Sequence, residues 1–126
     1  MPIGSELQGA LRSFVAVERE IVALGERADP TKAAEFVNMR RDLVMEFAKL
    51  GMALSNDPYL VANPDQMTQV TRLFSAFRAA NSINQADWPA IRVRDNPEGY
   101  KDACRPVAER SGAFWQWVER ELGHRR

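Results

Sequence analysis

The sequence has little of several features that would mark a functional class. Its 126 residues include one cysteine, Cys104, so an intrachain disulfide is excluded and the chain does not resemble a small disulfide-held secreted domain. Long apolar runs are missing too: no stretch approaches the ~20 residues that span a bilayer. The first residues also lack the basic and apolar segments of a signal peptide. We therefore expect a cytoplasmic protein that does not insert into a membrane.

An excess of charge of either sign is also missing. Lys and Arg total 17 residues, Asp and Glu total 17, and the formal net charge is zero. A protein built to bind nucleic acid needs a basic surface that displaces the counterions of the phosphates. The charge balance therefore argues against a nucleic-acid partner.

Patterns typical of catalysis or metal binding are absent from the sequence. It has no phosphate-binding glycine loop, no nucleophile elbow and no Glu-x-x-His pair. The single histidine, His124, lies in a polar C-terminal stretch far from Cys104, which we interpret as a small hydrophobic residue on an apolar stripe. We expect no enzyme, no catalytic residue, no metal site and no cofactor.

Helical periodicity is what the sequence does contain. In the stretch 29–54 the polar residues share one narrow sector of a helical wheel, which leaves an apolar arc wider than the ~100° that covers one neighbour. This helix should therefore contact several others. Helix-start signals recur, each a capping residue followed by proline, at Asp29-Pro30, Asn63-Pro64 and Asn96-Pro97.

These signals predict helices over about 6–27, 30–54, 64–84 and 97–122. The segment Ile91 to Arg94 alternates like a strand, and we interpret it as part of an extended connector between the third and fourth helices. Pro106 lies inside the fourth helix and should kink or split it. We expect one all-α domain over residues 1–126, a four-helix up-down bundle.

Two charged residues fall in the middle of apolar helix faces. Glu18 lies among apolar residues of the first helix, and Arg40 does so on the second. Both are about ten residues from the hairpin between these helices, so they should lie at one level. An unpaired buried charge is very costly, so we predict a structural ion pair between Glu18 and Arg40. The alternatives are side chains that reach out to solvent and a functional carboxylate at a site.

A second group of polar residues interrupts the apolar face of the third helix. Asn81 and Asn84 continue the stripe that Phe77 ends. Either the helix terminates there, since Asn is common at helix ends, or the two amides line a polar groove. In the second interpretation Tyr100 and Trp88 would converge on the same pocket.

Candidate partner-binding residues are Met45, Met52, Trp88 and Trp117. The two methionines lie on a flank of the second helix that four helices need not cover, and methionine suits adaptable surfaces. Trp117 lies to one side of the stripe of the last helix. It either closes the edge of the core or belongs to a partner interface, where Trp is enriched.

Two long antiparallel helices, followed by a helix that ends in Asn81-Ser82-Ile83-Asn84-Gln85, resemble the flagellar export chaperones that carry hook–filament junction proteins. The resemblance implies a small cytoplasmic helical protein whose last helix binds a client protein. The Trp88-Pro89 break and Pro106 depart from the long uninterrupted client-binding helix of that family.

The sequence favours a non-catalytic protein–protein interaction module, such as an adaptor, assembly factor, chaperone or accessory subunit of a larger complex. A homodimeric or small-ligand-binding helical bundle is the alternative, and a protein like the flagellar export chaperones is a further one. The partner expected is another protein or a second copy of the chain.

Overall fold

The structure is a computed structural model that describes residues 2–27 and 29–126, and these residues are all helical apart from short connections. The elements in chain order are α1 (Ser5–Arg27), a short 3-10 helix η1 (Pro30–Lys32), α2 (Ala33–Asn56), α3 (Pro58–Val61), α4 (Pro64–Asp87), α5 (Ala90–Asp95), α6 (Pro97–Ala103) and α7 (Arg105–Leu122). The predicted all-α class is confirmed, and the described residues contain no strand.

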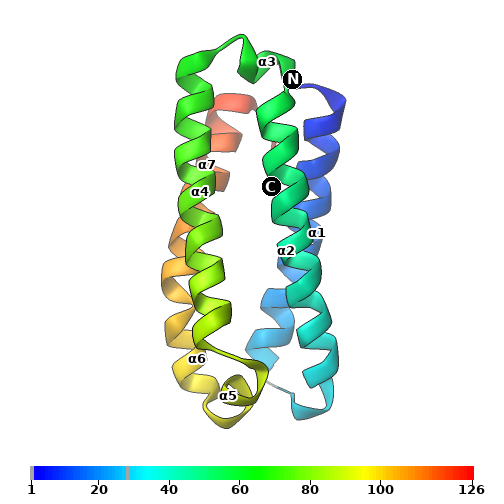
Figure 1. Cartoon of the computed structure of the whole chain (residues 1–126), viewed down its shortest axis with the longest axis vertical. Coiled ribbons are helices and arrows are strands. Elements are labelled where there is room, and N and C mark those ends of the chain that lie inside the picture. Colours follow the sequence, from blue (N-terminus) through cyan, green and yellow to red (C-terminus); the bar gives the residue numbers. More distant parts are fainter. Residues whose placement is uncertain (1, 28) are drawn as a thin grey trace.

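The long helices α1, α2, α4 and α7 run along the long axis of the molecule in a bundle-like arrangement (Figure 1). The short helix α3 lies at one end, and α5 and α6 lie toward the other. Helix α2 contacts α1, α3, α4 and α5, as its wide apolar arc predicts. Within the described residues, no helix is long and apolar enough to cross a membrane.

The starts of the helices are capped in different ways. Asp57 caps α3, where its carboxylate accepts from the Leu60 amide at 3.1 Å. Asn96 caps α6 by accepting from the Gly99 amide at 3.0 Å. Asn63 precedes α4 without a side-chain cap, because its amide group instead donates to the Tyr59 carbonyl at 2.7 Å.

The predicted extended connector is wrong, because residues Ala90–Asp95 form α5. The amides of Arg92 and Val93 both donate to the Pro89 carbonyl, at 2.9 and 3.1 Å, and start a helical turn. Val93 is buried. An alternating run this short also fits one helical turn with a single inward residue, so the pattern does not separate the two conformations.

Pro106 splits the last predicted helix instead of bending it. Helix α6 ends at Ala103 and α7 begins at Arg105, so Pro106 occupies the first turn of α7, where its missing N–H is tolerated. Cys104 joins the two helices and is half-buried rather than fully buried. The split allows α6 to set its own direction before α7 enters the bundle.

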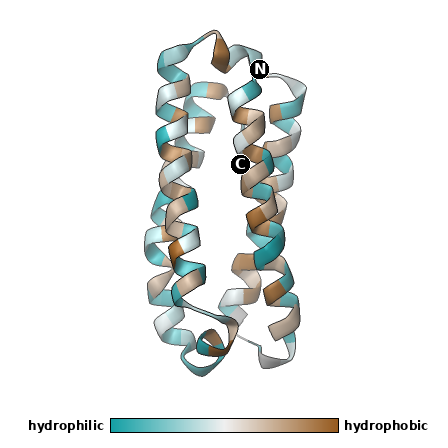
Figure 2. Cartoon of the chain, viewed as in Figure 1, coloured by the Kyte–Doolittle hydropathy of each residue, from teal (hydrophilic) through white to brown (hydrophobic). Residues whose placement is uncertain are grey.

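A chain of aromatic rings fills the centre of the bundle. Phe14, Phe47 and Phe77 are each at most 2% exposed and meet edge to face, with centroids 4.8 Å apart for Phe14–Phe47 and 4.9 Å apart for Phe47–Phe77. Phe114 and Trp115 extend this group from α7, 5.2 Å apart. Such edge-to-face pairs add to the stability given by apolar burial. Hydrophobic and hydrophilic residues alternate along the long helices (Figure 2), as expected where one face of each helix is buried.

The long helices do not all pack equally. Helix α1 packs most extensively against α2, and α4 against α7, whereas α2 and α4 join these pairs through a smaller contact. Over the described residues, α1 and α7 are not packed together to a comparable extent. The side of the bundle between α1 and α7 is therefore where space for a site remains.

Candidate functional site: a polar cavity within the bundle

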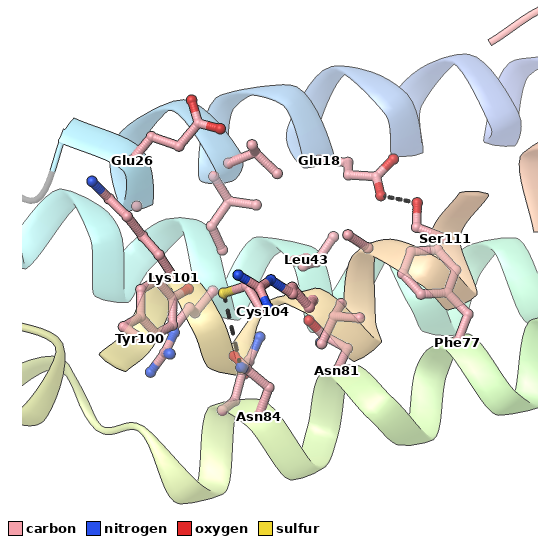
Figure 3. Close-up of a pocket in the computed structure, with 18 of the residues that line it drawn as sticks. Glu18, Glu26, Leu43, Phe77, Asn81, Asn84, Tyr100, Lys101, Cys104 and Ser111 are labelled. Carbon is pink, nitrogen blue, oxygen red and sulfur yellow. Dashed lines mark hydrogen bonds between the residues drawn. The ribbon is translucent and has the colours of Figure 1, made fainter. Parts of the chain in front are cut away.

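A cavity of about 500 Å³ lies between α1, α2, α4, α6 and α7 (Figure 3). Its apolar walls include Ile21, Leu43 and Phe77. The rim carries Glu26, Lys101 and Arg105, which are exposed, so the cavity is open to solvent. Small-molecule sites in proteins typically measure about 300–1,000 Å³ and combine apolar walls with a few convergent polar groups. The cavity meets both criteria.

Arg40 supplies a buried cation to this cavity. Arg40 is 8% exposed, and its Nη1 donates a hydrogen bond to the Trp88 carbonyl at 2.6 Å. The guanidinium lies 4.6 Å from the ring centroid of Phe36 and 5.8 Å from that of Tyr100. Nη2 is buried and has no hydrogen-bond partner. A guanidinium only donates hydrogen bonds, so the nitrogen Nη2 requires an acceptor.

Glu18 lies in the cavity wall with a different set of partners. Its Oε2 accepts from the Ser111 hydroxyl at 2.5 Å (Figure 3), and its Oε1 accepts from the Trp115 indole N–H at 3.1 Å. Oε1 also accepts from Arg126 Nη2 at 2.8 Å. Both residues of the predicted Glu18–Arg40 ion pair are described, and they do not form it.

The physical reason for this difference lies on α7. Ser111 and Trp115 are four residues apart, so they share one face of α7 and present two donors to the same carboxylate. The sequence places Glu18 only relative to the second helix, through the hairpin between the first two helices. Its actual partners are separated from it by more than ninety residues in the chain.

The C-terminal residues fold back along the bundle. Gly123 has φ 69°, in the left-handed region that ends helices and reverses the chain. Arg126 thereby reaches Glu18, and the C-terminus lies alongside the long helices rather than at their tips (Figure 1). His124 is 5% exposed in this segment. Burial, and then the charge of Arg12, lower the pKa of its imidazole below the usual 6.5.

Asn81, Asn84 and Tyr100, the residues of the predicted polar groove, all line the cavity (Figure 3). Asn84 Nδ2 donates to the Ala103 carbonyl at 3.2 Å, which ties α4 to α6. The helix does not terminate at these residues, because α4 continues to Asp87. Trp88, the fourth residue expected there, is not part of the lining.

Tyr100 keeps its hydroxyl proton under all ordinary conditions. Burial raises the pKa of Tyr100 to about 12, and the neighbouring Cys104 thiol acts in the same direction. The hydroxyl is thus a neutral group beside the Arg40 guanidinium. It can donate or accept a hydrogen bond, and it does not compensate the positive charge.

Trp88 and Trp117 are not available to a partner. Trp117 is 4% exposed, and its indole donates to Gln69 Oε1 at 2.8 Å, so it closes the edge of the core. Trp88 is 8% exposed and packs against Tyr100, with ring centroids 5.9 Å apart. Intramolecular packing covers both rings, so neither presents the exposed ring surface that the predicted partner interface would use.

Met45 and Met52 are exposed on α2, at 53% and 67%. Val37 and Val44 are also exposed on this helix. The spacing of the four residues places them on one face, which points away from the cavity and the core. The structure thus separates the predicted sites into a buried polar cavity and an exposed apolar face.

Three functional candidates have no sequence prediction: Gln85, Ser111 and Arg126. Gln85 follows Asn81 by one helical turn, so it shares the face of the two asparagines, and its Nε2 is buried in the cavity lining without a partner. That spacing alone could have added Gln85 to the groove. Nothing comparable in the sequence marks Arg126, because it reaches Glu18 only through the reversal at Gly123.

Comparison with protein-family models, with curated proteins and with solved structures finds no match to the chain. The likeness to flagellar export chaperones therefore stays a prediction from the sequence.

Proposed function

We propose that the protein is a non-catalytic small-ligand-binding helical bundle, and that the cavity between α1, α2, α4, α6 and α7 is its binding site. One observation carries the proposal: Arg40, a buried cation with an unpaired N–H donor, is one of the residues that line a cavity of ligand size. An unsatisfied buried donor costs about 1–3 kcal/mol. This cost is removed when a bound ligand supplies the missing hydrogen-bond acceptor.

The architecture supports the proposal. We take α1, α2, α4 and the α6–α7 segment as the four members of an up-down bundle, the arrangement expected from the sequence. Bundles of this kind place ligands between facing helices, where side chains project inward from several of them. The cytoplasmic location expected from the sequence is part of the same proposal.

Thermal unfolding with a panel of metabolites tests the proposed site. A ligand that binds only the folded state stabilises it by about 2.7 kcal/mol at one hundred times its Kd. Val107 lines the cavity and is half-buried, so Val107→Trp should fill the space. The matched control is Val61→Trp, at a position that is 60% exposed and outside the cavity.

The expected result is that compounds raise the unfolding temperature of the wild type and of Val61→Trp, and do not raise that of Val107→Trp. Compounds that stabilise all three proteins equally would place the binding site elsewhere. A chemically broad panel that stabilises none of them would overturn the proposed function.

A second candidate function is the interaction module, whether adaptor, assembly factor, chaperone or accessory subunit. The exposed face of α2 formed by Val37, Val44, Met45 and Met52 favours it, since apolar patches on a surface often mark contacts with another protein. Affinity capture from the native cell, repeated with Met45→Glu and Met52→Glu together, tests it. A partner that the double variant retains at full yield would argue against this face.

A further inference from the structure

The orphaned polar atoms of the cavity have one property in common. Arg40 Nη2 and Gln85 Nε2 are both nitrogen donors, both are buried, and neither has a hydrogen-bond partner. Both residues line the same cavity. An occupant that satisfies them must therefore bring hydrogen-bond acceptors.

The charge of the cavity defines the acceptor further. Among the described residues no carboxylate forms an ion pair with Arg40, whose guanidinium contacts the Trp88 carbonyl, the Phe36 ring, and the ring and hydroxyl of Tyr100. Glu18 is the other deeply buried charge in the lining, and Arg126 already compensates it. One positive charge is thus left without a counter-charge, and buried charges in proteins are normally paired.

We infer that the ligand is a small monocarboxylic acid with an apolar body, and that its carboxylate accepts a hydrogen bond from Arg40 Nη2. This inference rests on the proposed function and names the ligand class of that site. The apolar walls formed by Ile21, Leu43 and Phe77 receive the body of the ligand. Arg40 Nη1 is held by the Trp88 carbonyl, so the carboxylate meets the Nη2 side of the guanidinium.

A single negative charge fits this site better than a doubly charged phosphate. Of the described cations in the lining, only Arg40 is deeply buried, since Lys101 and Arg105 are exposed at the rim and Arg126 is exposed and paired with Glu18. A second negative charge on the ligand would therefore lack a buried counter-charge. Gln85 Nε2 adds a neutral donor, which suits an additional carboxylate or carbonyl oxygen.

Titration calorimetry at neutral pH with phenylbutyrate, its neutral analogue phenylbutyramide and inorganic phosphate tests the assignment. The acid and the amide share one apolar body and differ in charge. The acid should bind the wild type about tenfold to a hundredfold more tightly, the range of a charge-assisted hydrogen bond. Arg40→Met should abolish this preference. The matched control, Arg41→Met, changes an exposed arginine of the same helix outside the lining and should keep it.

Each other outcome overturns the inference in a recognisable way. Equal binding of acid and amide to the wild type would show that the site does not recognise the carboxylate of a ligand, although the cavity would still be a binding site. If phosphate binds more tightly than the acid and its binding depends on Arg40, the ligand class is a phosphate and not a carboxylic acid. If neither organic probe binds, the ligand class is wrong, and the metabolite panel with Val107→Trp decides separately whether the cavity binds anything. The comparison of acid and amide needs only the wild type, so it stands even if Arg40→Met fails to fold.

Discussion

Replacing Glu18 by Gln should destabilise the protein through its contacts with α7. Glu18 is only 7% exposed, and its carboxylate accepts hydrogen bonds from Ser111, Trp115 and Arg126. The amide keeps the size of the side chain and one acceptor oxygen, but it loses the negative charge. Its nitrogen also replaces an acceptor with a donor, so one of the three present bonds must be lost or reversed.

The expected loss is about 2–3 kcal/mol. Hydrogen bonds to charged groups contribute about 1.5–3 kcal/mol, against about 0.5–1.5 for neutral ones. The change from a charged to a neutral group therefore costs about 1–1.5 kcal/mol for each of the bonds with Ser111 and Trp115. The contribution of Arg126 is discounted because its side chain is 42% exposed and solvent screens the pair.

Chemical unfolding at neutral pH measures this loss, with Glu20→Gln as the control. Glu20 is exposed on the same helix, and a surface change of this kind should stay within about 0.5 kcal/mol. If Glu18→Gln is as silent as Glu20→Gln, the network around Glu18 does not hold α1 to α7, and our reasoning about the buried carboxylate is refuted.

Three further predictions concern pH and packing. Burial raises the pKa of Tyr100 to about 12, so the unfolded chain loses this proton first, and stability should fall as pH rises from 10 toward 12. Unfolding of Tyr100→Phe across this range should show a smaller fall, and an identical one would contradict the assignment. Burial lowers the pKa of His124 below 6.5, so stability should decline as pH falls below 6.5, and His124→Gln should lessen that decline. An added methyl group in Gly99→Ala would lie 2.5 Å from Nδ2 of Asn96, the residue that caps α6, and 2.9 Å from the Trp88 ring, and should cost about 1–3 kcal/mol in urea unfolding. In Gly112→Ala it meets no atom within 4 Å, so this variant should gain about 0.5–1 kcal/mol. Equal effects of the two substitutions would contradict the packing around Trp88.

Local signals in the sequence predicted the helices well and the short elements poorly. The asparagine and proline at Asn96-Pro97 mark the start of α6, and the apolar arc of residues 29–54 marks the helix with most neighbours. The segment around Ile91 failed, because an apolar–polar alternation over four residues fits a strand and one helical turn equally. Backbone hydrogen bonds settle the conformation: the Pro89 carbonyl accepts from two following amides, and the Arg92 carbonyl accepts from the Asn96 amide.

The candidate site was predictable in its residues and not in its pairings. Burial of Glu18 and Arg40 follows from their positions on apolar faces. Their partners do not, because those depend on how α7 and the C-terminal residues return to α1, and no local pattern encodes that. Trp117 illustrates the same limit: its wheel position left two environments open, and the contact with Gln69 on α4 decides between them.

Methyl-resolved NMR spectra recorded while phenylbutyrate and phenylbutyramide are added would show directly whether the cavity binds a ligand. We predict saturable shifts at the methyl groups of Ile21, Leu43 and Val107, which line the cavity, and none at Met45 and Met52 on the opposite exposed face. The absence of saturable shifts at the cavity methyl groups, or shifts confined to the two methionines, would contradict the proposed ligand site.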